Sequence, residues 1–155
     1  MAIVTETRWL DDEEMLAWLA LASLFIKLPA ALDRQLQRDA GLSHFEYQVL
    51  AGLSQAPDWT LRMSDLAKFT EGQLPRLSQV AARLEKRGWL TRMADPTDGR
   101  FTLGTLTEAG MAKLVETAPS HVSTVRRLVF DSLSPEQVGQ LRDIARHIVD
   151  AVEGD

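Results

Sequence analysis

Apolar residues crowd the two ends of this chain, whereas apolar and polar positions alternate regularly in its middle. The most apolar run spans residues 15–26 and follows the acidic stretch Asp11 to Glu14, which suits the cap and first turn of a helix. Apolar residues lie all round this predicted helix, so we expect it to be buried, in part against a second subunit. Pro29 favours a kink within the helix, and Gly41 ends it.

The middle of the chain predicts a helix-turn-helix. Ser43 and Glu46 have the spacing of a capping box, which predicts a helix to about Ser54. Two shorter helices follow at 63–69 and 74–87, and a tight connection containing a glycine joins them. Proline is acceptable in the first turn of the second of these helices.

A β-hairpin is predicted directly after the helix-turn-helix. Residues 89–93 and 101–103 alternate between apolar and polar side chains, which is typical of strands. Residues 95–99 between them are Asp, Pro, Thr, Asp and Gly, all of which favour turns. The hairpin therefore has a polar tip.

Two further helices are predicted toward the C-terminal end. Thr107 caps the first, which runs to about Phe130 with a break at Pro119 left open, and Ser134 opens a second capping box. The fold class is thus mainly α with a small β-wing. We expect residues 43–107 to form one domain that contains the helix-turn-helix and the β-wing. Residues 1–42 and 108–155 are expected to form a discontinuous helical domain that pairs two subunits.

Charge distribution indicates a polyanion-binding face in the middle of the chain. The 155 residues carry a net charge of −5, yet residues 60–104 hold eight Lys or Arg against five Asp or Glu. A basic segment within an otherwise acidic chain is typical of a surface that binds nucleic acid, although charged residues often serve only to keep a surface solvated. The 15–26 run is shorter than the ~20 residues of a membrane span. We therefore expect no membrane contact and a cytoplasmic location.

The helix predicted at 74–87 has the pattern of a DNA recognition helix. Its apolar positions fall on one face, and a polar stripe of Arg76, Gln79, Arg83 and Lys86 falls on the other. Arginine reads guanine edges with two parallel hydrogen bonds, and glutamine can read adenine in the same way. Ser78 can serve a phosphate. An ordinary solvated helix face explains the stripe equally well when this helix is taken alone.

The hairpin tip favours the DNA-binding interpretation. Arg100 follows the turn directly, and an arginine held there can enter the minor groove, where the negative potential is enhanced. Asp98 would repel DNA if it were free, so we expect it to pair with a nearby arginine and orient it.

Other chemistry has less support in the residues. Trp18, Phe25 and Tyr47 can line a ligand pocket, but such residues are more often plain core. The histidines at 44, 121 and 147 are far apart in sequence, and neither a zinc motif nor a nucleophile–base constellation is present. The chain also contains no cysteine, which excludes disulfides and thiolate chemistry. We therefore expect no enzyme activity, no cofactor and no metal.

Several motifs carry a family resemblance along nearly the whole chain. They are RLEKRGWLTR at 83–92, DPTDGR at 95–100 and LTEAG at 106–110, with EYQVL at 46–50 and SDLA at 64–67. In this order and spacing the chain resembles the MarR family of winged-helix regulators. The resemblance implies a triangular homodimer built on the first and last two helices, with each recognition helix in one half-site of a pseudo-palindromic operator.

The resemblance also implies roles for particular residues. Asp98 and Arg100 match the wing signature, in which the arginine probes the minor groove, and Arg92 joins the DNA-binding set. Members typically repress transcription, and many release DNA when they bind small, often phenolic, ligands. A small aromatic effector is thus implied here, with Trp18, Phe25, His44 and Tyr47 as candidate contacts.

One departure from the family pattern keeps an alternative open. Pro75 falls where many members have a small polar residue, and the overall charge is acidic. The alternative is a dimeric ligand-binding or protein-interaction module that does not bind DNA.

Overall fold

The computed structural model describes residues 7–70 and 72–155 and is mainly helical with one small sheet, as the sequence predicted. The elements in chain order are α1 (Asp12–Ala40), α2 (His44–Gln55), η1 (Pro57–Trp59), β1 (Thr60–Arg62), α3 (Met63–Phe69), α4 (Leu74–Lys86), β2 (Leu90–Ala94), β3 (Thr102–Leu106), α5 (Glu108–Val125), η2 (Arg126–Phe130) and α6 (Pro135–Glu153).

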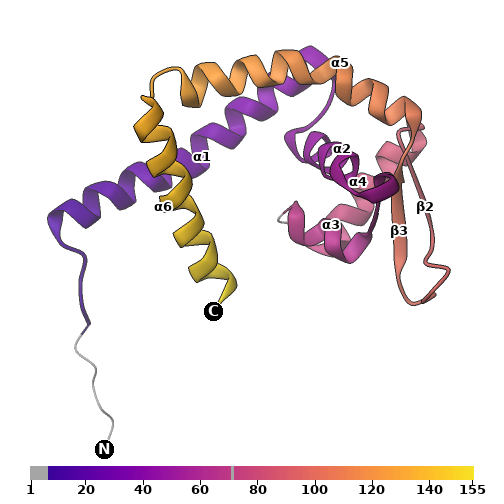
Figure 1. The fold of residues 1–155 in the computed structure, drawn as a ribbon, viewed down its shortest axis with the longest axis horizontal. Coiled ribbons are helices and arrows are strands. Elements are labelled where there is room, and N and C mark those ends of the chain that lie inside the picture. Colours follow the sequence, from indigo (N-terminus) through magenta and orange to yellow (C-terminus); the bar gives the residue numbers. More distant parts are fainter. Residues whose placement is uncertain (1–6, 71) are drawn as a thin grey trace, which may run out of the picture.

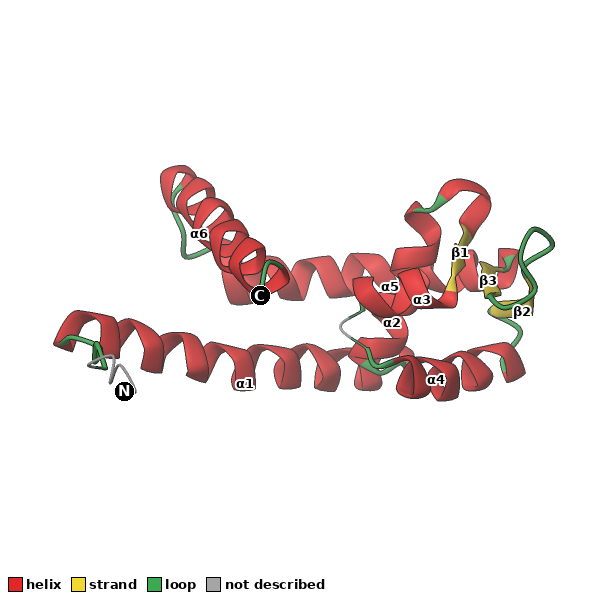
Figure 2. Ribbon diagram, turned by 90° about the horizontal axis from the view of Figure 1, so that it is seen from below, coloured by secondary structure: helices red, strands yellow, loops and turns green. Residues whose placement is uncertain are grey.

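The chain divides into a compact lobe and an arm of long helices. Figure 1 shows α2, α3, α4 and the strands gathered at one end, while α1 and α5 lie side by side and extend away from them. In Figure 2, α6 stands apart from α1 at the far end of the arm, and the hairpin of β2 and β3 projects from the lobe. The first and last helices, α1 and α6, thus lie in the arm, and the lobe is carried between α1 and α5.

The helices begin where their capping residues predict. Asp11, Ser43 and Ser134 each accept a hydrogen bond from the backbone N–H three residues on, and each forms a complete capping box. Gly41 ends α1 in the left-handed conformation, with a φ of 65°. The helix α1 continues through Pro29, and α5 continues through Pro119, so each remains one helix along its length.

The hydrophobic core lies in the lobe. The apolar face of α4, predicted from its periodicity, is buried there, and the fully buried side chains are contributed by α1, α2, α3, α4 and the sheet. They include Leu36, Leu50, Leu66, Leu77, Leu84, Leu90 and Leu106. This packing gives α4 one fixed orientation, with its polar face directed away from the core.

The sheet has one more strand than the sequence predicted. Besides the expected hairpin of β2 and β3, the short strand β1 pairs antiparallel with β3, and Thr60 lies opposite Thr105. Their hydroxyl oxygens are 2.9 Å apart. A strand of three residues is too short for alternation to be recognised, so the pattern alone could not reveal it.

The apolar arm is exposed within one subunit, so the chain's own packing does not supply the burial that the sequence predicted for residues 15–26. Leu16, Trp18 and Ile26 are 62%, 52% and 73% exposed, and α6 has no buried residue. The helix α1 also holds an 18-residue window with a mean hydropathy of 1.9, which by length and composition would suffice to cross a membrane. The chain's own packing therefore leaves a large apolar face uncovered.

Candidate nucleic-acid interface

The polar stripe of α4 lies on the surface of the lobe. Arg76, Gln79, Arg83 and Lys86 are all exposed, and Ser78 is half-buried beside them. The apolar face of the helix is packed below, so this set of donors is presented by a rigid element. The solvent-facing stripe that the sequence predicted is confirmed, whereas its contacts with DNA stay a prediction.

Arg83 is tied to α2 through a buried carboxylate. Its Nε lies 3.4 Å from Oε1 of Glu46, a residue that is only 8% exposed. The other oxygen of Glu46 accepts the backbone N–H of Ser43 at 3.0 Å. One carboxylate therefore caps α2 and also pairs with an arginine of α4.

Arg92 joins the hairpin to α4. Its Nε and Nη2 both donate to Oε2 of Glu85, at 3.2 and 3.0 Å, and its backbone N–H donates to Oε1 at 3.1 Å. A further bond runs from Nη1 to the backbone oxygen of Ser78 at 3.5 Å. These bonds set the spacing between β2 and α4, which gives Arg92 a positioning role beside the predicted DNA contact.

The wing tip holds the predicted pair of Asp98 and Arg100. The guanidinium donates to both carboxylate oxygens of Asp98, and these bonds lower the pKa of Asp98 and raise that of Arg100. Arg100 is 84% exposed in its side chain and Asp98 26%. The expectation that Asp98 pairs with an arginine and orients it is thus confirmed.

A second ion pair at the base of the wing escaped the sequence analysis. Nε of Arg62 lies 2.8 Å from Oδ2 of Asp95, a buried carboxylate that also accepts the backbone N–H and the hydroxyl of Thr97. These bonds lower the pKa of Asp95, with those from Thr97 the largest cause. The Arg62 guanidinium also covers the ring of Phe101 at 4.3 Å. Arg62 comes from β1, so only recognition of that strand could have revealed the pair.

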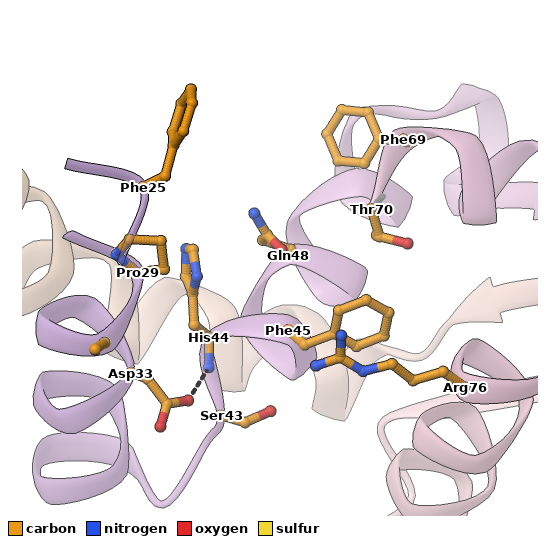
Figure 3. Close-up of a pocket in the computed structure, with 11 residues that line it drawn as sticks. Phe25, Pro29, Asp33, Ser43, His44, Phe45, Gln48, Phe69, Thr70 and Arg76 are labelled. Atoms are coloured by element: carbon orange, nitrogen blue, oxygen red, sulfur yellow. Dashed lines mark hydrogen bonds between the residues drawn. The ribbon is translucent and has the colours of Figure 1, made fainter. Parts of the chain in front are cut away.

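A cleft of about 860 Å³ separates the arm from α4. Figure 3 shows Phe25 on α1 and His44 at the start of α2 among its lining side chains, and Arg76 enters from α4. Trp18 and Tyr47 do not line this cleft. Tyr47 instead packs on His121 with 4.3 Å between ring centroids and borders a separate hollow beside α5. The structure therefore brings together two of the four predicted ligand contacts.

A polar junction joins α1 to α5 behind the cleft. Gln35 bonds to His121 at 3.0 Å, and its amide nitrogen donates to Asp39 at 2.9 Å and to Ser120 at 3.2 Å. The Ser120 hydroxyl in turn donates to Asp39 at 2.6 Å, and this bond, followed by those from Gln35 and Arg38, lowers the pKa of Asp39 to about 2. Residues 86 positions apart form this junction, and the sequence pattern gave no signal for it. Within the described residues, no group of three or more histidines and carboxylates could hold a metal ion.

A helix-turn-helix followed directly by a β-hairpin, as in α3, α4, β2 and β3, is the architecture of the winged helix-turn-helix class. A model of the MarR family matches residues 40–100. The chain is similar to Sco3205, a MarR family transcriptional regulator from Streptomyces coelicolor whose crystal structure was solved in complex with DNA. The two sequences are 44% identical, and the two structures superpose with a TM-score of 0.90. That similarity covers 95% of this chain and 92% of Sco3205. The chain belongs to the MarR family, and it is a transcriptional regulator.

Two curated relatives match over a shorter length. The HTH-type transcriptional regulator YxaD of Bacillus subtilis strain 168 is 33% identical over 86 residues, which are 56% of this chain and 59% of YxaD. The transcriptional repressor MprA of Escherichia coli strain K12 is 26% identical over 113 residues, 73% of this chain and 64% of MprA. The chain thus spans less than two thirds of either relative, and both relatives are transcriptional regulators.

Proposed function

We propose that this protein binds DNA sequence-specifically as a homodimer and represses transcription. The observation that carries the proposal is that one rigid lobe presents two DNA-binding elements, the polar stripe of α4 and Arg100 at the tip of the hairpin. The exposed stripe of α4 fits the major groove, and Arg100, held by Asp98, fits the minor groove. Sco3205, whose structure was solved with DNA, and MprA, which is named a repressor, support the same function here.

The uncovered apolar face of the arm supports a homodimer. Exposed apolar side chains on α1 and α6 form a surface of the kind that marks an interface, and charged residues bound α1 at both ends. We assign this surface to a second copy of the chain rather than to a membrane, and we place the protein in the cytoplasm. A single lobe carries only a weakly basic face, so useful affinity depends on two lobes acting together.

The cleft supports release by a small aromatic effector. Its walls combine three phenylalanine side chains with several polar ones, so they offer a small aromatic molecule both stacking surfaces and hydrogen-bond partners. We propose Phe25 and His44 as effector contacts, and we place Trp18 in the dimer interface because it is exposed on the arm.

Substitution of one arginine in each of the two DNA-binding elements tests this function. Arg83→Ala and Arg100→Ala are each expected to weaken operator binding about tenfold in a gel-shift titration, because each removes one charge-assisted contact. Size-exclusion chromatography should show the same dimer as in the wild type. Operator affinity that stays unchanged in both variants would contradict the proposal.

A further inference from the structure

Arg62 contacts the turn of the wing at both of its ends. Its Nε lies 2.8 Å from Oδ2 of Asp95, where the chain leaves β2. Its guanidinium carbon lies 4.3 Å from the ring centroid of Phe101, where the chain enters β3. Arg62 itself is the last residue of β1 and directly precedes α3. One side chain therefore joins the helix-turn-helix to both strands of the hairpin that projects from the lobe (Figure 2).

Asp95 is the buried partner in this contact. It is only 6% exposed, and its Oδ1 accepts the backbone N–H of Thr97 at 2.9 Å and the hydroxyl of the same residue at 2.7 Å. Oδ2 is left to accept from Nε of Arg62. A buried carboxylate that loses its cationic partner is strongly destabilised. The first half of the turn therefore depends on Arg62 for its conformation.

Backbone hydrogen bonds extend this arrangement to the tip of the wing. The N–H of Asp98 donates to the backbone oxygen of Asp95 at 3.2 Å, and the N–H of Phe101 donates to that of Asp98 at 3.0 Å. Asp98 then holds Arg100 through two bonds. Bonds from Arg100 lower the pKa of Asp98 most, and the charge of Arg62 lowers it further. Arg62 thus acts on both carboxylates of the turn.

We infer that Arg62 is a positioning residue for the minor-groove contact of Arg100, and that it acts through Asp95. This inference rests on the proposed function, in which Arg100 enters the minor groove. A wing tip that is free to reorient must be ordered when DNA binds, and this loss of conformational freedom lowers the affinity. Arg62 therefore contributes to the preference for particular base pairs at the operator flanks without itself contacting a base.

A direct contact between Arg62 and a DNA phosphate is the competing explanation, because the arginine side chain is 38% exposed. A phosphate contact strengthens binding to every DNA sequence alike, whereas a well-positioned Arg100 strengthens binding only where the minor groove suits it. The two explanations also differ for Asp95. Removing its negative charge would harm the positioning of Arg100, but it would not weaken a phosphate contact of Arg62.

The experiment compares two operators that differ only in the minor groove at the flanks of the half-sites. One carries guanine·cytosine pairs there. The other carries inosine·cytosine pairs, which lack the 2-amino group that guanine places in the minor groove. The wild-type dimer should bind the inosine operator about fivefold more tightly in fluorescence anisotropy. Arg100→Ala should bind the two operators equally.

Three variants break the pair of Arg62 and Asp95. Arg62→Met and Asp95→Asn each remove one partner, and asparagine can still accept the bonds from Thr97. The double variant leaves no unpaired buried charge, so it keeps the test valid if Arg62→Met alone does not fold. We expect all three to reduce the preference for the inosine operator to about twofold or less, because the two partners act as one unit and their effects do not add.

Lys68→Met is the matched control. It removes an exposed cation of α3 and its ion pair with Asp65 from the same lobe, and it should keep the wild-type preference. The inference is overturned if Asp95→Asn and the double variant keep the wild-type preference, whether or not they bind both operators more weakly. It is also overturned if the wild type binds both operators tightly and equally. A wild type that binds neither operator would refute the proposed function, and this inference with it.

Discussion

Nη2 of Arg100 lies 2.7 Å from Oδ2 of Asp98, and Nε of the same arginine donates to Oδ1 at 3.0 Å. A two-point pair of this kind fixes the plane of the guanidinium as well as its position. The negative charge of Asp98 orients Arg100, although the same charge repels DNA. If the wing reads the minor groove, the binding free energy gained by orienting Arg100 must therefore exceed the free energy lost through repulsion between Asp98 and the DNA.

Replacing Asp98 tests this balance. Asp98→Asn removes one of the two charge-assisted bonds and releases Arg100 from its fixed plane. We expect operator affinity to fall about tenfold, a change of roughly 1.4 kcal/mol. Affinity for non-operator DNA should stay the same or rise, because a negative charge has gone. Fluorescence anisotropy on both DNA sequences measures the two effects.

A charge-matched control excludes a general electrostatic effect. Asp58→Asn removes the same charge from an exposed turn of the same lobe, and asparagine tolerates the positive φ found there. This control should not lower operator affinity. An Asp98→Asn protein that binds operator and non-operator DNA more tightly would show that Asp98 does not position Arg100.

Gly110 allows α5 to approach the start of the hairpin closely. A Cβ atom at this position would come within 2.6 Å of Leu106 Cδ1 and closer still to the backbone oxygen of Trp89. That oxygen also accepts the N–H of Thr107 at 3.1 Å, so it cannot move freely. We expect Gly110→Ala to destabilise the folded protein by about 1–3 kcal/mol in chemical denaturation. Gly99→Ala, at a position with nothing within 4 Å, should change stability little.

The junction of α1 and α5 predicts a pH dependence of stability. The Gln35 amide nitrogen donates to Asp39, so its oxygen faces His121, and Nδ1 of His121 carries the hydrogen. Burial, with the nearby His44 as a smaller cause, lowers the pKa of His121 below its ordinary value of 6.5. The unfolded chain therefore binds more protons just below pH 6.5.

Stability should consequently fall as the pH drops below about 6.5 and level off above it. Asp39 does not interfere, because its pKa near 2 confines its own loss of stability to pH values below about 4. His121→Asn keeps a donor toward Gln35 but does not titrate, so its unfolding free energy should depend less on pH between 5 and 7. An unchanged pH profile in this variant would rule out His121 as the titrating group.

The dimer interface can be tested on α6 with two neighbouring residues. Ile148 belongs to the apolar stripe of this helix and is 40% exposed within one subunit, whereas His147 lies about 100° away around the helix axis. Ile148→Asp should raise the dimer dissociation constant by about tenfold or more, because it buries an unpaired charge in the proposed interface. His147→Asp should leave the dimer intact in analytical ultracentrifugation. Equal behaviour of the two variants would place the interface elsewhere.

Local patterns predicted much of the fold from the sequence. The capping boxes at Ser43 and Ser134 fixed helix starts, and the buried and exposed faces of α4 followed its periodicity. These features depend on residues within a few positions of one another, so a single sequence contains them. The pair of Asp98 and Arg100 was predictable for the same reason.

Contacts between distant segments could not be predicted. The ion pair of Arg62 and Asp95 depends on β1, and the bond between Gln35 and His121 joins two helices that meet only in the folded chain. Arg76 looked like any other member of the polar stripe until packing placed it against Phe45. Tyr47 and Phe25 looked alike as candidate ligand contacts, yet packing turned only Phe25 toward the cleft.

Footprinting on genomic DNA tests the central claim most directly. The wild-type protein should protect a pseudo-palindromic site whose two half-sites lie about one helical turn apart or a multiple of it, because two recognition helices enter the major groove on one side of the duplex. Arg83→Ala should lose protection within the half-sites, and Arg100→Ala should lose it at their flanks. A wild-type protein that enriches and protects no site would contradict the account and favour a dimeric module without DNA binding.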